Sequence, residues 1–143
     1  MVPVKNALGP TMLRTHRANK YGYAVHFDGN GRCAAQGCEI DFEAMASHLL
    51  CLAEAAEVHG LSVWRVIFAP DLQPHLFATN KGEQLQEKLS FSKKQSWVRH
   101  DEHYHIDFHN PEEADEGTPS RTSSWKTPNG GGVEPRVKRS EPW

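Results

Sequence analysis

The last quarter of the sequence lacks the side chains that build a protein core. From Asn110 to Trp143 there is no Leu, Ile, Phe or Met, whereas Pro, Gly, Ser, Thr and charged residues dominate. Such a segment cannot bury enough apolar surface to offset the entropy lost when its chain is ordered. We therefore expect one folded domain over residues 1–109 and a flexible Pro/Gly/Ser-rich tail over residues 110–143.

Charge and hydropathy exclude several classes of protein. A net charge of -2 does not suit a protein whose main role is to neutralise phosphates, so we expect no nucleic-acid partner. No apolar run approaches the roughly 18 residues that cross a bilayer, and the N-terminal residues lack the basic and apolar regions of an ordinary signal peptide. The expectation is a monomer with neither a membrane partner nor an ordinary secretion signal.

The apolar pattern before residue 110 predicts a mixture of strands and helices. Apolar residues at three- and four-residue spacing between Met45 and Ala56 predict an amphipathic helix, which Gly60 ends. The other expected elements are a strand over Tyr21–Phe27, a turn over Asp28–Gly31, a strand over Cys38–Phe42, a buried strand over Leu61–Phe68, a short helix over Glu83–Leu89 and a strand at the end of Trp97–Phe108. Together they predict an α+β fold with a small, mostly antiparallel sheet, helices packed on one side and an open face.

Three cysteines, Cys33, Cys38 and Cys51, are too few and odd in number for a disulfide framework. The C-x4-C spacing of the first two lacks the second pair that defines a zinc ribbon. Two interpretations of this pair stay open at this point, ordinary thiols or a local bridge.

Four of the nine histidines fall between residues 100 and 109. On a strand, residues two apart project from the same face, so His103 and His105 can bind one ion or one substrate. A catalytic zinc site keeps three protein ligands and one water, so further donors have to come from elsewhere, with His26, Asp41 and His100 as candidates. A solvated or hydrogen-bonded histidine pair without metal is the alternative. The density of histidines and carboxylates around residue 103 favours metal.

The string Val98–Phe108 resembles the C-terminal active-site strand of the penicillin-insensitive murein endopeptidases, zinc peptidases grouped with lysostaphin, D-Ala-D-Ala carboxypeptidases and the Hedgehog signalling domain. The match is H-x-x-H-x-H followed by alternating apolar residues, while upstream Glu39–Phe42 resembles the family's carboxylate segment and Arg65–Phe68 its central strand. The resemblance spans about residues 12–108. It implies a zinc ion in a cleft on the open face of the sheet.

The resemblance also implies roles for individual residues. The implied Zn²⁺ ligands are His26, Asp41 and His105, and the implied catalytic residues beside the metal-bound water are His100 and His103. His103 is the candidate general base because it shares a strand face with His105. Glu102 points the other way in a regular strand, so we expect it to be solvated, with a role as the base as the alternative.

The spacing between His26 and Asp41 departs from the family pattern. Six residues separate the ligand His and Asp in the family, whereas fourteen separate His26 from Asp41 here. An insertion at a hairpin tip would still return both ends to the metal, because antiparallel neighbours meet whatever the loop length. Asp28 and His16 are the alternatives to His26.

These features predict a zinc-dependent endopeptidase that hydrolyses peptide cross-links of bacterial peptidoglycan, and the resemblance implies D,D-endopeptidase activity on D-Ala to diaminopimelate bonds. The expected site of action is the periplasm or cell wall, reached by type VI secretion or phage lysis, with a cognate immunity protein as a partner. One alternative is a non-catalytic zinc-binding domain of the same fold. Another is a His-metal nuclease of the ββα type, suggested by His109-Asn110, although that class expects a helix after the histidine strand and a basic groove.

Overall fold

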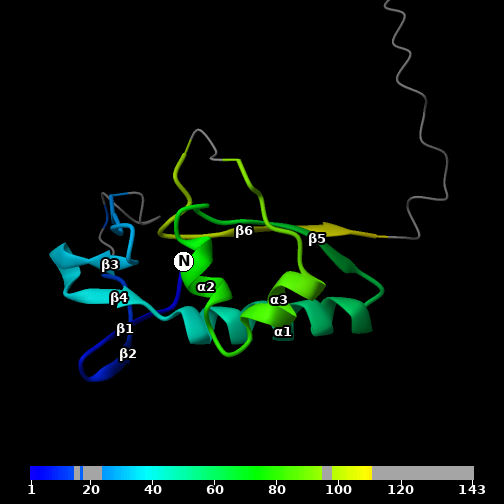
Figure 1. The fold of residues 1–143 in the computed structure, drawn as a ribbon, viewed down its shortest axis with the longest axis horizontal. Helices are drawn as coiled ribbons and strands as arrows, with labels where there is room; N and C mark the ends of the chain where they lie inside the picture. The colour runs from blue at the N-terminus through cyan, green and yellow to red at the C-terminus, as the bar shows by residue number, and fades with distance from the viewer. Residues whose placement is uncertain (15–16, 18–23, 95–97, 111–143) are drawn as a thin grey trace, which may run out of the picture.

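The computed structural model describes residues 1–14, 17, 24–94 and 98–110. The elements are β1 (Val4–Asn6), β2 (Gly9–Thr11), β3 (Arg32–Cys33), a 3-10 turn (Ala34–Gln36), β4 (Cys38–Ile40), α1 (Phe42–Val58), β5 (Ser62–Ile67), α2 (Gln73–Phe77), α3 (Gly82–Lys88) and β6 (His105–His109). In this part of the chain they form an α+β arrangement of antiparallel sheets and three helices, which confirms the predicted class (Figure 1). The tail beyond Asn110 lies outside the described residues.

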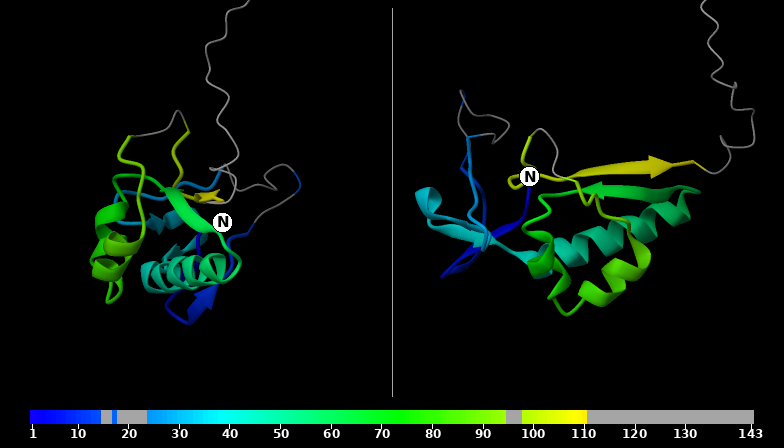
Figure 2. Two further views of the ribbon diagram at one scale, coloured as in Figure 1. Left: turned by 90° about the vertical axis from the view of Figure 1, so that its right-hand side faces the viewer. Right: turned by 45° about the horizontal axis from the view of Figure 1, so that its top comes forward.

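The strands form two sheets, whereas the sequence predicts one. The first has the order β2-β1-β4-β3, and Val4 pairs with Ile40 at its centre. The second consists of β5 and β6, and the helices lie on one side of it (Figures 1 and 2). The two sheets share one core, since buried residues of both belong to the same apolar cluster.

The β5–β6 pair positions the histidine segment. Its register runs from Ser62 opposite His109 to Ile67 opposite His105, with an irregularity beside Trp64. The predicted strand is confirmed, but the expectation that it is fully buried is wrong, because Trp64 is 60% exposed. A two-stranded sheet with helices on one side leaves its other face in solvent.

Helix α1 follows the predicted periodicity. Its buried residues are Met45, Ala46, Leu49, Leu50, Ala53 and Ala56. The Asp41 carboxylate accepts a hydrogen bond from the Ala44 N–H at 3.1 Å, which caps the first turn. The chain leaves the helix at Gly60, whose φ of +73° favours glycine. None of the helices in the described ranges is long and apolar enough to cross a membrane.

Residues 24–27 do not form the strand predicted for Tyr21–Phe27, and residues 21–23 lie outside the described part. Val25 and Phe27 are buried and His26 is exposed, so the period-two pattern is real. The Phe27 N–H, however, donates to the Asp101 carboxylate, and its carbonyl accepts from Arg99. Side chains thus replace the neighbouring strand that the pattern suggests.

The predicted turn after this segment is present. The Asp28 carboxylate accepts hydrogen bonds from the N–H groups of Asn30 and Arg32, at 2.9 and 2.8 Å. Gly31 has a φ of +74°, and a Cβ there would lie 2.8 Å from the Phe42 ring. Both the backbone conformation and the close approach therefore require glycine at this position.

Candidate metal centre

Three imidazoles meet where the chain enters β6. His105 is the first residue of the strand, while His100 and His103 lie in the irregular segment before it. The ring centroids form a nearly equilateral triangle, 4.9 Å from His100 to His103 and 4.8 Å from His105 to each of the others. Within the described ranges this is the one group of three or more histidines, cysteines and carboxylates that could hold a metal ion.

The spacing of the ring nitrogens fits a common ligand. Nε2 of His103 and Nε2 of His105 are 2.9 Å apart, and the ligand atoms of all three residues lie within 4.8 Å of one another. Two nitrogens bound to one tetrahedral zinc ion are about 3.4 Å apart, because each Zn–N bond is about 2.1 Å long. The pair at 2.9 Å would therefore open slightly and the widest pair would close by no more than about 1.4 Å, which small side-chain rotations can supply.

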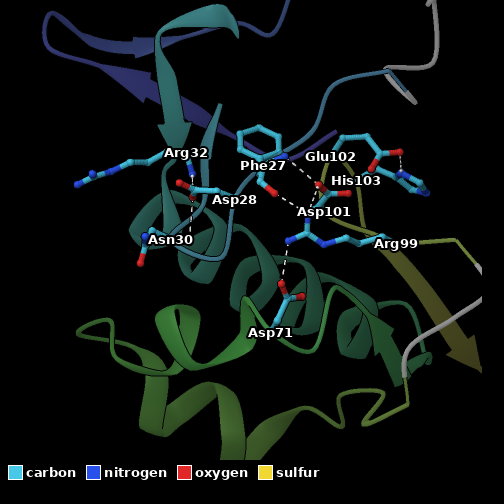
Figure 3. A network of polar contacts seen from close by, with 9 residues as sticks. All are labelled: Phe27, Asp28, Asn30, Arg32, Asp71, Arg99, Asp101, Glu102 and His103. Carbon is cyan, nitrogen blue, oxygen red and sulfur yellow. Dashed lines mark hydrogen bonds and ion pairs between the residues drawn. The ribbon is translucent and has the colours of Figure 1, made fainter. Parts of the chain in front are cut away.

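Glu102 holds His103 from behind. Its side chain is 3% exposed, and its Oε1 lies 2.9 Å from Nδ1 of His103 (Figure 3). In neutral His103 this contact keeps the proton on Nδ1 and leaves the Nε2 lone pair facing His105. The expectation that Glu102 is solvated is wrong. It assumes a regular strand through Glu102, but β6 begins only at His105, so the alternation of a strand does not apply to Glu102.

Asp101 ties the same segment to residues 25–28. It is 1% exposed, and its Oδ2 accepts hydrogen bonds from the Phe27 N–H and from Arg99 Nη1, each at 2.9 Å (Figure 3). Arg99 Nη2 also donates to Asp71 Oδ2 at 2.8 Å. A buried carboxylate is stable only when charge and hydrogen bonds compensate its lost hydration, and this network supplies both.

Burial lowers the pKa of His100 below its usual value of 6.5, and the neighbouring His103 and His105 lower it further when they carry charge. A lowered pKa favours the neutral form of the His100 imidazole. A neutral imidazole has the free lone pair that a metal ion needs. The local environment therefore favours the metal-binding form of this residue.

Of the three ligands implied by the resemblance, only His105 belongs to this group. Asp41 lies at the start of α1, where one carboxylate oxygen caps the helix. His26 has an exposed side chain, flanked by buried Val25 and Phe27. His100 and His103, expected beside the metal-bound water, instead lie where ligands would. The alternative Asp28 is engaged in its own turn, and His16 lies outside the described residues.

Tyr104 and His48 form a contact that the sequence patterns do not reveal. The Tyr104 hydroxyl lies 2.6 Å from Nδ1 of His48 on α1. It anchors the residue between His103 and His105 to the longest helix. No pattern in the sequence links the two residues, which are 56 positions apart.

Comparison of the chain with family models, curated proteins and solved structures found no match. The resemblance to the murein endopeptidases stays a prediction.

Proposed function

We propose that this protein is a zinc-dependent hydrolase whose metal is held by His100, His103 and His105. The observation that supports the proposal is the triangle of imidazoles with Glu102 behind one of them. Three histidines with a fourth position open to water are a known zinc hydrolase ligand set, and a carboxylate behind a ligating histidine is its usual support. A zinc ion there would polarise a substrate carbonyl and lower the pKa of a bound water.

Other residues position the histidines and leave one side of the site accessible. Glu102 orients His103 and fixes its proton on Nδ1, and Tyr104 anchors the intervening backbone through His48. His105 is exposed, so a substrate can approach the site from its side. The Asp101–Arg99 pair holds the segment in place through the backbone of Phe27.

We propose peptide cross-links of peptidoglycan as the substrate, cut by D,D-endopeptidase action. This part rests on the H-x-x-H-x-H string and its resemblance to the murein endopeptidases. Action in the periplasm or on the cell wall, delivery by type VI secretion or phage lysis, and an immunity protein as a partner belong to the same proposal.

A second candidate is a metal-binding domain without hydrolytic activity. A specific observation favours it, because His100 and His103 lie within the ligand group. Histidines that lie beside the metal without binding it could transfer protons and would argue for catalysis. Three histidine ligands, in contrast, are compatible with a catalytic site and with a binding site.

One experiment separates the two candidates. Purified full-length protein, loaded with one equivalent of Zn²⁺, is incubated with peptidoglycan sacculi, and the released muropeptides are separated by chromatography. The hydrolase should convert cross-linked dimers into monomers, a chelator should stop it, and added zinc should restore it. Stoichiometric zinc binding without any release of monomers would support the non-catalytic domain, and no zinc binding would contradict both.

A further inference from the structure

We infer that Cys33 and Cys38 form a reversible disulfide across strands β3 and β4 when a small-molecule disulfide is present. The two residues are directly opposite partners in the antiparallel ladder. Directly opposite side chains lie on the same face of a sheet. Both are free thiols in the described structure, and both are buried. This inference is independent of the metal site.

The spacing of such partners suits a bridge. Opposite residues of an antiparallel pair have Cα atoms about 4.5 or 5.5 Å apart, and disulfides span about 4.4–6.8 Å. Their Cβ atoms lie about 4.5–5.5 Å apart, whereas a bridge needs about 3.8 Å. A movement of roughly 1 Å is therefore sufficient.

The position of β3 in the fold permits that movement. β3 is the edge strand of the order β2-β1-β4-β3 and is only two residues long, so a single neighbour fixes it. The connection from Cys33 to Cys38 contains Gly37 in the left-handed region, with a φ of +61°. A short edge strand on a tight turn can approach β4 without disturbing the rest of the core.

A hollow at the protein surface lies beside the pair. Cys33 and Cys38 border a hollow of about 450 Å³ that Asp28, Arg32 and Gly37 also line. Burial raises the pKa of the Cys38 thiol, and the adjacent Cys33 raises it further. Because only the thiolate attacks a disulfide, we expect oxidation at neutral pH to be slow but complete.

The chemistry is two thiol–disulfide exchanges with glutathione disulfide. One cysteine thiolate attacks a glutathione sulfur and expels glutathione thiolate, which takes up a proton. The second cysteine thiolate attacks the mixed disulfide and expels the other glutathione. The two cysteine thiols are oxidised to one disulfide, and one glutathione disulfide is reduced to two glutathione molecules.

The test uses the full-length protein equilibrated with excess glutathione disulfide. Free thiols are alkylated in acid, and the chain is cut after Arg32 by trypsin and after Glu39 by a Glu-specific protease. The resulting peptide 33–39 holds both cysteines and separates them from Cys51. We expect it to be lighter than the reduced peptide by two hydrogen atoms and to carry no alkyl group. Alkylated cysteines, glutathione adducts or links to Cys51 in its place would overturn the inference.

Matched variants give a second readout. Cys51→Ser removes the exposed thiol and should leave the bridge intact. Oxidation should raise the Tm of the wild type and of Cys51→Ser by roughly 5 °C, and should leave the Tm of Cys33→Ser and Cys38→Ser unchanged. An equal response of all four proteins would show that the pair forms no bridge and serves only as small apolar side chains of the core.

Discussion

Two irregular segments lie side by side, one of which carries the three histidines, and they differ in the groups that they contribute to the contacts between them. Residues 99–105 supply side chains, with Asp101 and Glu102 only 1% and 2% exposed. Residues 25–28 supply backbone, since both the N–H and the carbonyl of Phe27 bind side chains of the other segment (Figure 3). The comparison shows that the buried Asp101 carboxylate supplies a hydrogen bond that the unpaired Phe27 backbone needs.

The largest effect should appear when histidines of the two segments are compared as metal ligands. His105→Ala removes a member of the triangle and should weaken Zn²⁺ binding by more than the roughly 100-fold that a lost supporting residue costs. His26→Ala and Asp41→Asn should leave the affinity unchanged, and asparagine preserves the α1 cap. Competition with a chromophoric zinc chelator measures all three. A loss in His26→Ala equal to that in His105→Ala would restore the ligand set implied by the resemblance.

The next effect concerns stability. Asp101→Ala leaves the Phe27 N–H without its acceptor and removes the buried partner of Arg99. Loss of one member of a buried pair costs about 3–5 kcal/mol, and the partial exposure of Arg99 places the expected loss near the lower end. Urea denaturation followed by circular dichroism measures it.

Asp71→Ala is the control for that experiment. Asp71 binds the same Arg99, but its side chain is 46% exposed, so the loss should be below about 1 kcal/mol. Equal losses in the two variants would mean that burial of Asp101 contributes nothing to stability.

Local spacing made much of the histidine site predictable. His103 and His105 are two residues apart and His100 is three residues further back, so one short stretch of chain carries all three rings. The pairing of His26 with Asp41 requires the fold to close a long loop, and no local pattern determines that. Helix α1 was predictable from its apolar period, and strand β5 from its β-branched and aromatic residues.

Two incorrect predictions have separate physical causes. The alternation around Val25 and Phe27 predicts a strand, but Asp101 gives Phe27 the hydrogen bond that a neighbouring strand would have given. A regular strand through Glu102 predicts a solvated carboxylate, but β6 begins only at His105, and Glu102 is buried against His103. Strands β1 and β2 are three residues each and carry no period-two apolar pattern, so this half of the four-stranded sheet gives no sequence signal.

A smaller effect should come from the other buried carboxylate. Glu102→Gln keeps the size and an acceptor oxygen but loses the charge, so His103 becomes a weaker zinc ligand. We expect about 10-fold weaker Zn²⁺ binding with an unchanged circular dichroism spectrum. Glu57→Gln on the exposed surface of α1 is the matched control and should bind zinc like the wild type. Unchanged affinity in Glu102→Gln would show that the contact with His103 does not support the metal.

The smallest effect should come from Asp28, the last residue of the segment 25–28, whose carboxylate organises the turn that follows. The hydrogen bond from the Arg32 N–H lowers the pKa of the Asp28 carboxyl, with a further contribution from the Asn30 N–H. A carboxyl whose pKa is lower in the folded protein stabilises the fold above its unfolded pKa of about 3.9, and that contribution disappears as the pH falls through the folded pKa.

Asp28→Asn keeps an acceptor for both N–H groups but does not titrate. Its Tm should therefore lie slightly below that of the wild type at pH 7, and the difference should shrink as the pH falls below about 4. Thermal melts at several pH values measure this, with Glu57→Gln as the control for general loss of an exposed acid. A difference that stays constant from pH 7 to pH 3 would mean that the charge of Asp28 does not stabilise the turn.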